Sequence, residues 1–313
     1  MCFTLQDLVL VLLQQVVKSF IILQNIPKLD FYYSFQDHPL LDITIGHTPD
    51  ADDAFMFYGM LSGKVTSPHF NVKHVVEDIE TLNRRSLKHE LDVTAVSAHA
   101  CAYLDEYTIL RSGGSFGKGY GPIVVAKQEM DVKKLQSSKI AIPGKLTSAF
   151  LLLELMIGKF DYTEMKFSDI PDAVADGQVD AGLVIHEGQI TYDQKNLVKL
   201  LDVGSWWRDS TGGLPVPLGV NVMSNHFGID TIKKFDEFFR ESIVYGMARP
   251  GEALDYAMQY GRGQSKETID RFVRMYVNDV TIEMGVLGEQ AIRNLFQFGI
   301  EKGLVPQFEL RIA

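Results

Sequence analysis

Asp180-Ala-Gly-Leu-Val-Ile-His-Glu-Gly-Gln-Ile-Thr-Tyr192 contains a short apolar run that ends at a histidine. Its apolar residues, 181–185, lie between an acidic residue and a His-Glu-Gly sequence, which is typical of a short parallel strand covered on both faces. Ligands of open α/β sheets bind beyond the carboxyl ends of the strands. The strand would therefore bring His186 to the edge of a sheet where chemistry is expected, although a lone histidine there is more often structural.

The composition describes a globular chain with one large or two medium domains. Its 313 residues are 46% hydrophobic and 22% charged, which is enough to form a sizeable core. The formal net charge of -10, together with the lack of a long basic run, argues against nucleic acid as a partner. The two cysteines, Cys2 and Cys101, form no Cys-x-x-Cys pair and suit a reducing cytoplasm.

Residues 1–40 are predicted to be an N-terminal extension outside the main domain, with a role that the sequence does not define. The segment 8–23 is apolar but is interrupted by Gln14, Gln15 and Lys18. A spanning helix needs about 20 mostly apolar residues, and a signal peptide has a positive start and a small-residue cleavage site. An amphipathic extension is favoured over export, and a peripheral membrane contact is the less favoured alternative.

Strands and helices are predicted to alternate in two blocks and to be followed by a helical tail. The predicted strands are residues 41–46, 70–76, 91–97, 123–126, 139–144, 165–167, 181–185 and 220–223. The predicted helices are residues 77–87, 98–104, 150–157, 170–175, 231–249, 251–260, 266–276 and 285–302, and one that begins after Pro49. In the helix 77–87, Ile79, Leu82 and Leu87 are expected to face inward.

This order of elements predicts an α/β protein with two doubly wound lobes. The chain would leave the first lobe near Val125 and return near Val220, and these two crossing strands would form a hinge beside a cleft. Lobe one would then comprise residues 41–125 and 221–313, and lobe two residues 126–220.

An acidic sequence follows the first predicted strand. His47 with Asp50, Asp52 and Asp53 has the residue types of an oxygen-rich metal site. The favoured interpretation is a helix N-terminus, where acids complement the helix dipole and accept free backbone N–H groups. No metal is predicted.

Polar side chains follow four of the predicted strands. They are Asp53, Ser97, Thr147 with Ser148, and His186. The glycine turn before Thr147 and Ser148 opens a helix, and such a helix N-terminus can bind an anion, although ordinary capping by Thr or Ser has the same sequence. Imidazole suits a general acid or base near neutral pH. From spacing alone, a transport receptor and an enzyme are both possible; an exported receptor would need a signal peptide, which the sequence lacks.

Several ordered motifs resemble the 1,4-dihydroxy-6-naphthoate synthase family of the futalosine route to menaquinone. They are Thr48-Pro-Asp-Ala-Asp-Asp-Ala-Phe55, Glu77-Asp-Ile-Glu-Thr-Leu-Asn83, Arg111-Ser-Gly-Gly114, Gly182-Leu-Val-Ile-His-Glu-Gly188 and Leu214-Pro-Val-Pro-Leu-Gly219. The resemblance covers the chain from about residue 41 onward and implies the two-lobe, type II periplasmic-binding-protein-like fold.

The resemblance also implies an activity. The family is a cofactor-free carbon–carbon lyase that converts cyclic dehypoxanthinyl futalosine, a small-molecule aromatic carboxylate, to 1,4-dihydroxy-6-naphthoate and dihydroxyacetone. His186 would be the general base. The substrate would be bound by Asp53, Asn83, Ala95, Val96, Ser97, Thr147, Ser148 and Ala149.

The sequence departs from the family pattern at the first motif. That motif usually reads Ser-Pro-Cys-Pro-Asn-Asp, and here Asp50, Ala51 and Asp52 precede Asp53. Ser97 is usually followed by Tyr, and here by Ala98. Two alternatives therefore stay beside the synthase: a non-catalytic small-molecule binder of the same fold, and a chorismate dehydratase of the same pathway.

Overall fold

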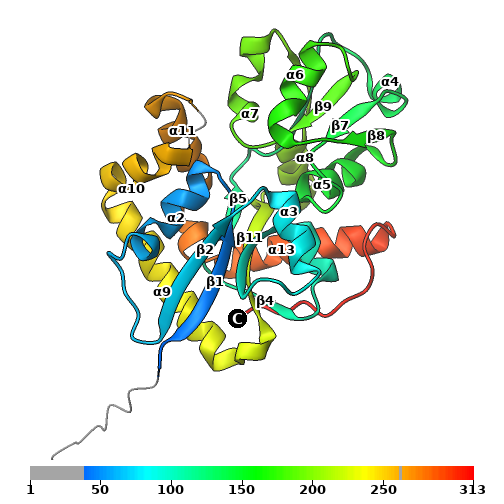
Figure 1. Cartoon of the computed structure of the whole chain (residues 1–313). Coiled ribbons are helices and arrows are strands. Elements are labelled where there is room, and N and C mark those ends of the chain that lie inside the picture. The colour runs from blue at the N-terminus through cyan, green and yellow to red at the C-terminus, as the bar shows by residue number, and fades with distance from the viewer. Residues whose placement is uncertain (1–38, 261–262) are drawn as a thin grey trace, which may run out of the picture. The chain divides into compact units, whose positions relative to one another are not determined.

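Two β-sheets organise residues 39–260 and 263–313, which are the residues that this computed structural model describes (Figure 1). The first sheet has the strand order β2-β1-β3-β11-β4, with β5 paired to β11. Its strands are β1 (Leu41–His47), β2 (Phe70–Val76), β3 (Val93–Ser97), β4 (Tyr107–Ile109), β5 (Ser115–Gly117) and β11 (Val216–Ser224). The second sheet has the order β10-β6-β9-β7-β8. Its strands are β6 (Ile123–Ala126), β7 (Ile140–Ile142), β8 (Tyr162–Glu164), β9 (Ala181–Val184) and β10 (Val198–Asp202).

Helices connect the strands and form most of the C-terminal part of the chain. The α-helices are α2 (Ala51–Leu61), α3 (Ile79–Ser86), α4 (Val132–Gln136), α5 (Ser148–Ile157), α6 (Ile170–Ala175), α7 (Gly188–Thr191), α8 (Val203–Thr211), α9 (Ile229–Ala248), α10 (Pro250–Ala257), α11 (Lys266–Tyr276), α12 (Asp279–Ile282) and α13 (Gly285–Glu301). Short 3₁₀ turns are η1 (Ala98–Tyr103), η2 (Phe167–Asp169), η3 (Tyr192–Lys195), η4 (Asn225–Phe227) and η5 (Met258–Tyr260). None of the helices within the described ranges is long and apolar enough to cross a membrane.

The first sheet is covered on both faces. Ile43 and Ile45 of β1 pack into a buried cluster with α2, α9, α10 and α11. On the opposite face, Gly46 lies so close to Leu82 of α3 that an added Cβ would be 2.9 Å from a Leu82 methyl carbon. β1 runs parallel to β2 and β3, whereas β11 runs antiparallel to β3. The parallel strands β1 and β3 therefore end at the same edge of the sheet.

The second sheet is also buried on both faces, which explains the apolar runs that predict it. In β6, Val124 packs into the cluster that contains α5, and its neighbour Val125 packs into the cluster that contains α6. In β9, Leu183 and Val184 alternate between the same two clusters. β9 is parallel to β7 but antiparallel to β6, so the predicted parallel strand belongs to a mixed sheet.

The chain crosses between the sheets twice. It leaves the first sheet after β5, at Gly117, and returns to it with β11, at Val216. These two crossing strands pair with each other, as expected for a two-strand hinge. Val125 lies in the second sheet and Val220 in the first, so both crossings precede the positions expected from the sequence. The bounds of the two lobes as separate domains stay a prediction.

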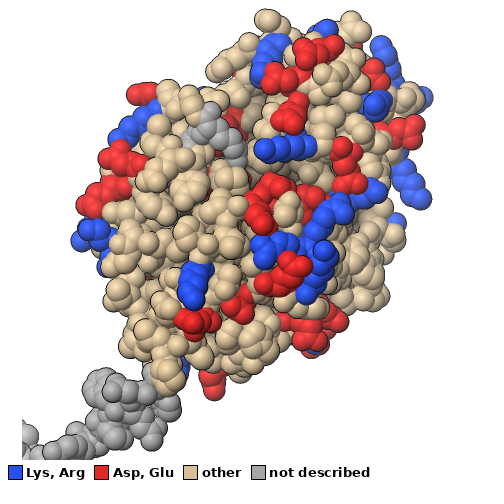
Figure 2. Space-filling view, viewed as in Figure 1, with Lys and Arg blue, Asp and Glu red and all other residues tan. Residues whose placement is uncertain are grey.

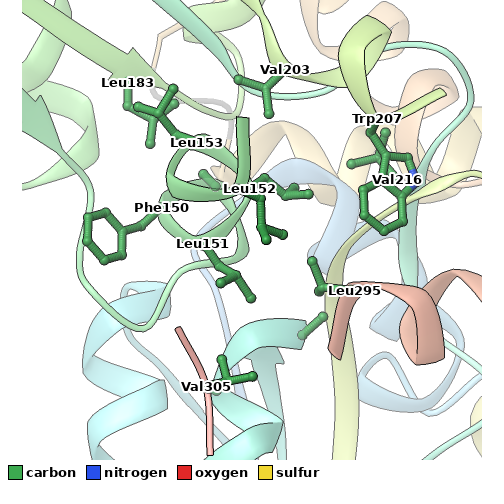
Figure 3. Close-up of a cluster of buried hydrophobic side chains, with 14 of the residues drawn as sticks. Phe150, Leu151, Leu152, Leu153, Leu183, Val203, Trp207, Val216, Leu295 and Val305 are labelled. Atoms are coloured by element: carbon green, nitrogen blue, oxygen red, sulfur yellow. The ribbon is translucent and has the colours of Figure 1, made fainter. Parts of the chain in front are cut away.

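Helix α5 carries the centre of the largest apolar cluster (Figure 3). Leu151, Leu152 and Leu153 are fully buried. They share the cluster with Trp207 of α8 and Leu295 of α13. α5 also contacts β11 and η1 of the first sheet. Since burying one such side chain contributes about 1.5–3 kcal/mol, this packing fixes the start of α5 beside the first sheet.

Three sequence expectations differ from the structure, and several elements were not predicted. Residues 165–167 form no strand, because the β7–β8 pairing ends at Glu164 and Phe167 is buried within η2. Leu87 is 40% exposed, because α3 ends at Ser86 and Leu87 lies beyond its inward face. Residues 98–104 form a 3₁₀ turn in place of an α-helix. The strands β4, β5, β8 and β10 and the helices α4, α7, α8 and α12 were not predicted. The predicted extension, residues 1–40, lies outside the described residues except for its last two.

Candidate active site

One cavity lies where the carboxyl ends of strands from both sheets meet. It encloses about 680 Å³ of empty volume, part of which is open to solvent. Its lining comes from both sheets and from α11, and consists of Thr48, Asp52, Asp53, Ile79, Ala95, Val96, Ser97, Gly113, Ser115, Pro122, Thr147, Ser148, Ala149, Ile185, His186, Gln189, Leu218, Gly219, Val220, Asn221, Phe272 and Tyr276.

The residues predicted for the site are brought together, with one exception. Those that line the cavity are Asp53, Ala95, Val96, Ser97, Thr147, Ser148, Ala149 and His186. Asn83 does not line it. The convergence follows from topology, since the polar residues follow β1, β3, β7 and β9 at the ends that face one another. Their roles in binding and catalysis stay predictions.

Asn83 acts from behind the cavity wall. Its side chain is fully buried and is 3.1 Å, through Nδ2, from Ser97 Oγ, to which it donates. Its Oδ1 accepts the Ser97 backbone N–H at 2.9 Å. Asn83 therefore fixes the position of Ser97, and has no surface of its own in the cavity.

Thr147 and Ser148 begin α5, and both hydroxyls already have partners. Thr147 is the N-cap, and its Oγ1 accepts the Phe150 N–H and donates to the Gly144 carbonyl at 2.7 Å. Ser148 Oγ donates to the Leu218 carbonyl at 2.5 Å and accepts the His99 N–H at 3.2 Å. The capping interpretation is therefore correct for Thr147. The first N–H groups of a helix lack intrahelical acceptors, so the backbone at Ser148 and Ala149 can still bind an anion in the cavity.

His186 directly follows β9 and has a left-handed backbone, with φ of 54°. This conformation is uncommon for a residue other than glycine and is found where surrounding structure enforces it. The imidazole lies 4.6 Å, centroid to centroid, from the Phe167 ring and 6.3 Å from the Phe272 ring. Its Nε2 is buried and has no hydrogen-bond partner among residues 39–260 and 263–313.

The side chain of Asp50 lies beside His186 and does not cap the helix that Asp50 precedes. Asp50 is the N-cap of α2, yet its side chain accepts no capping hydrogen bond. Its Oδ2 is 3.5 Å from His186 Nδ1, and the side chain is 1% exposed. The predicted helix N-terminus with its acids is confirmed, since α2 begins at Ala51 with Asp52 and Asp53 in its first turn. The Asp50 carboxylate does not cap this helix and lies toward the imidazole.

Two further carboxyl groups share this end of the cavity. Burial raises the pKa of Asp52 well above its usual value, and the neighbouring charges of Asp53, Asp50 and Glu187 raise it further. Burial also raises the pKa of Asp53 to about 6, against the lowering effect of two hydrogen bonds from Thr48. Like charges in a buried site cannot all be ionised at low cost. The site therefore favours the protonated form of Asp52.

Gln189 and Tyr276 close the cavity beside His186. The Gln189 amide and the Tyr276 hydroxyl form a hydrogen bond of 2.7 Å. With the amide oxygen as the acceptor, the same oxygen also lies 3.1 Å from the His186 backbone N. Burial raises the pKa of the Tyr276 hydroxyl, which therefore stays protonated. This pair links α7 of the second sheet to α11.

Among the polar residues near His186, four were not assigned to the site from the sequence: Asp50, Asp52, Gln189 and Tyr276. A usable signal existed for the two acids, since they follow the same strand as Asp53. Tyr276 carried no such signal, because it belongs to a helix of the C-terminal part. Over the described part of the chain, no three His, Cys, Asp or Glu side chains are grouped so as to hold a metal ion.

The family described as menaquinone biosynthesis matches residues 43–301, and this range contains every residue of the cavity. The chain belongs to the menaquinone biosynthesis family. A 1,4-dihydroxy-6-naphthoate synthase from Thermus thermophilus is 40% identical over 263 residues, which are 84% of this chain and 95% of the relative. Because a relative at this level of identity is a synthase, the chain is an enzyme of the menaquinone biosynthesis family.

Solved structures agree with the fold. A crystal structure of an Archaeoglobus fulgidus protein matches with a TM-score of 0.81 and 47% identity, and covers 84% of this chain and 98% of that one. The ligand-binding component of an ABC-type import system from Staphylococcus aureus matches with a TM-score of 0.64 at 15% identity, and covers 87% and 96%. The second likeness shows the fold alone. The predicted two-lobe, periplasmic-binding-protein-like fold class of this family member is confirmed.

Proposed function

We propose that the protein is a 1,4-dihydroxy-6-naphthoate synthase. In this reaction, cyclic dehypoxanthinyl futalosine is cleaved to 1,4-dihydroxy-6-naphthoate and dihydroxyacetone by a cofactor-free carbon–carbon lyase. The name and identity of the Thermus relative support the choice of reaction. The proposal includes action in the cytoplasm, which suits a biosynthetic family and a chain whose two cysteines form no Cys-x-x-Cys pair.

The observation that carries the proposal is the state of His186. Its Nε2 is buried and unpartnered, while its ring lines the cavity. A neutral imidazole nitrogen in that position can accept a proton from a bound substrate. General-base catalysis contributes typically 10²- to 10⁴-fold to a rate. Orientation of the substrate and exclusion of water would supply the remainder.

The substrate carboxylate would bind at the start of α5. No Lys or Arg is found among the described residues that line the cavity. The backbone N–H groups at Ser148 and Ala149, at the positive end of the helix dipole, are therefore the groups best suited to an anion. The acids at the other end would repel a carboxylate and accept hydrogen bonds from substrate hydroxyls. This polarity orients the substrate with its carboxylate toward α5 and its hydroxyls toward Asp53.

The experiment is to incubate the purified protein with the cyclic futalosine derivative and to quantify dihydroxynaphthoate by mass spectrometry. His186→Asn is the variant of choice, because asparagine tolerates the left-handed backbone at this position. We expect kcat to fall about 10²- to 10⁴-fold. His69→Asn, at an exposed histidine, is the matched control and should keep wild-type activity.

Other outcomes separate the competing functions. If the wild-type protein binds the substrate but forms no product, it is a binder and the proposal fails. If it consumes chorismate, it is a dehydratase. Full activity in His186→Asn would remove the histidine from the mechanism while leaving the reaction in place.

A further inference from the structure

The inference concerns Asp50 and rests on the proposed role of His186 as the base. A carboxylate at an N-cap position normally accepts a backbone N–H of the first helical turn. The Asp50 side chain does not do so. Instead, its Oδ2 lies 3.5 Å from His186 Nδ1, at a position that is 1% exposed. The Asp50 side chain therefore makes no capping hydrogen bond to α2 and instead lies next to His186, which follows a strand of the second sheet.

We propose that Asp50 is a positioning residue that holds the His186 imidazole across the cavity, with its Nδ1–H toward the carboxylate and its Nε2 toward the substrate. A carboxylate beside one ring nitrogen fixes the proton on that nitrogen and leaves the other as the acceptor. It also stabilises the imidazolium that forms when the base takes its proton. The unpartnered Nε2 is the nitrogen that this arrangement leaves for the substrate.

The aromatic rings on either side of His186 cannot supply this orientation. Phe167 and Phe272 lie within ring-contact distance of the imidazole, but they offer no hydrogen-bond acceptor. They limit the translation of the imidazole ring but permit both orientations that are related by a flip of the ring. Asp50 makes the orientations unequal in energy, because only one of them points Nδ1–H at a carboxylate.

Asp50 is better placed for this role than the nearby acids. Asp53 Oδ2 already accepts the backbone N–H and the hydroxyl of Thr48, both at 2.8 Å. Asp52 Oδ2 lies 3.5 Å from the Ser115 hydroxyl, which donates to it. The titratable groups around this end of the cavity are Asp50, Asp52 and Asp53 at the start of α2, Glu187 beside His186, and Tyr276 on α11. Of these, Asp50 is the group whose contact with the imidazole is an ion-pair distance.

The contact between Asp50 and His186 also makes the orientation of the imidazole depend on how close the two sheets are. Asp50 follows β1 of the first sheet, and His186 follows β9 of the second. Separation of the lobes about the β5–β11 crossing would remove Asp50 from His186. The base would then be oriented when the cavity is closed and free to rotate when it is open.

The test compares the wild type with Asp50→Asn and Asp50→Ser. Asparagine keeps the shape without the charge, and serine is a good N-cap, so that one of the two variants folds even if α2 depends on this position. Asp42→Asn is the matched control, since Asp42 is an exposed acid on β1 that pairs with Lys73. We expect kcat to fall about 10- to 100-fold in both Asp50 variants, as for other partners that orient a functional histidine. KM should change less than threefold, because the cavity keeps its lining.

Two further readouts distinguish positioning from a structural role. The acidic limb of the pH profile of kcat/KM should move to lower pH in Asp50→Asn. The negative charge of Asp50 raises the pKa values of Asp52 and Asp53, and its loss makes their protonation less favourable. Nitrogen-15 NMR of the histidine side chains, without substrate, should show His186 protonated at Nδ1 in the wild type and as a mixture of tautomers in the variant. A change in KM alone, or an unchanged tautomer, overturns the proposal.

The NMR readout also separates this inference from the proposed function. If the wild type makes no dihydroxynaphthoate, the synthase proposal fails, while the tautomer comparison still tests whether Asp50 orients His186. If the wild type is active and Asp50→Asn retains full kcat, the synthase proposal stands and the role of Asp50 is refuted.

Discussion

Replacement of Asn83 by alanine tests how the cavity wall is held together. Asn83 is fully buried and makes two hydrogen bonds to Ser97, one to the backbone N–H and one to the hydroxyl. After Asn83→Ala, the Ser97 N–H has lost its acceptor in a buried place, which costs about 1–3 kcal/mol. The Ser97 hydroxyl lines the cavity and can bind water, so the loss of its hydrogen bond adds only about 1 kcal/mol. The expected destabilisation is therefore about 2–4 kcal/mol.

The assay is urea denaturation followed by circular dichroism. With a slope of about 3 kcal/mol per molar urea, the midpoint should fall by about 1 M. Asn71→Ala is the control, since Asn71 is exposed and donates one hydrogen bond, to Asp42 at 2.5 Å. Its midpoint should change by a small fraction of that amount, because surface substitutions usually stay within about 0.5 kcal/mol. Equal, small shifts in the two variants would refute the assignment of Asn83 as the residue that holds Ser97.

Three further predictions concern single positions. Burial raises the pKa of Asp52, so the folded state binds a proton there more tightly than the unfolded state does. The stability that this proton contributes at low pH is lost as the pH rises through the raised pKa. Asp52→Asn should therefore increase the melting temperature at pH 8, and the difference from the wild type should vanish toward pH 4. Gly182→Ala would place a methyl group 2.4 Å from the Ile170 side chain and should lower stability by about 1–3 kcal/mol in the same urea assay. Burial raises the pKa of the Cys101 thiol to about 12, so iodoacetamide at pH 8 should label the Cys101 peptide only after denaturation; labelling of the native protein would show that the thiol is accessible.

The sequence predicts most of the fold because its strands are short apolar runs that end at polar residues. The strand Phe70–Val76 and the helix Lys266–Tyr276 have the predicted bounds. The failures occur where burial is set by distant partners. The alternation of Met165, Lys166 and Phe167 resembles a strand, yet Phe167 is buried in a 3₁₀ turn next to His186. Leu87 continues a helical pattern one residue beyond the end of the helix.

The candidate site was predictable in part for the same reason. Topology places the residues that follow β1, β3, β7 and β9 together, and no contact between individual side chains is needed to foresee this. Asp50 escaped prediction because an acid before a helix has a sufficient local explanation as a cap. Only the three-dimensional structure shows that its carboxylate lies 3.5 Å from His186 Nδ1. Asn83 was assigned to the substrate, whereas its partner is Ser97.

Simultaneous quantification of both products tests whether His186 in this cavity initiates carbon–carbon cleavage. The wild-type protein and His186→Asn are each incubated with cyclic dehypoxanthinyl futalosine, and dihydroxynaphthoate and dihydroxyacetone are measured in the same samples. If His186 is the base, we expect equimolar products from the wild type and at least a hundredfold slower formation of both by the variant. Failure of the wild type to form either product, or equal rates for the two proteins, would contradict it.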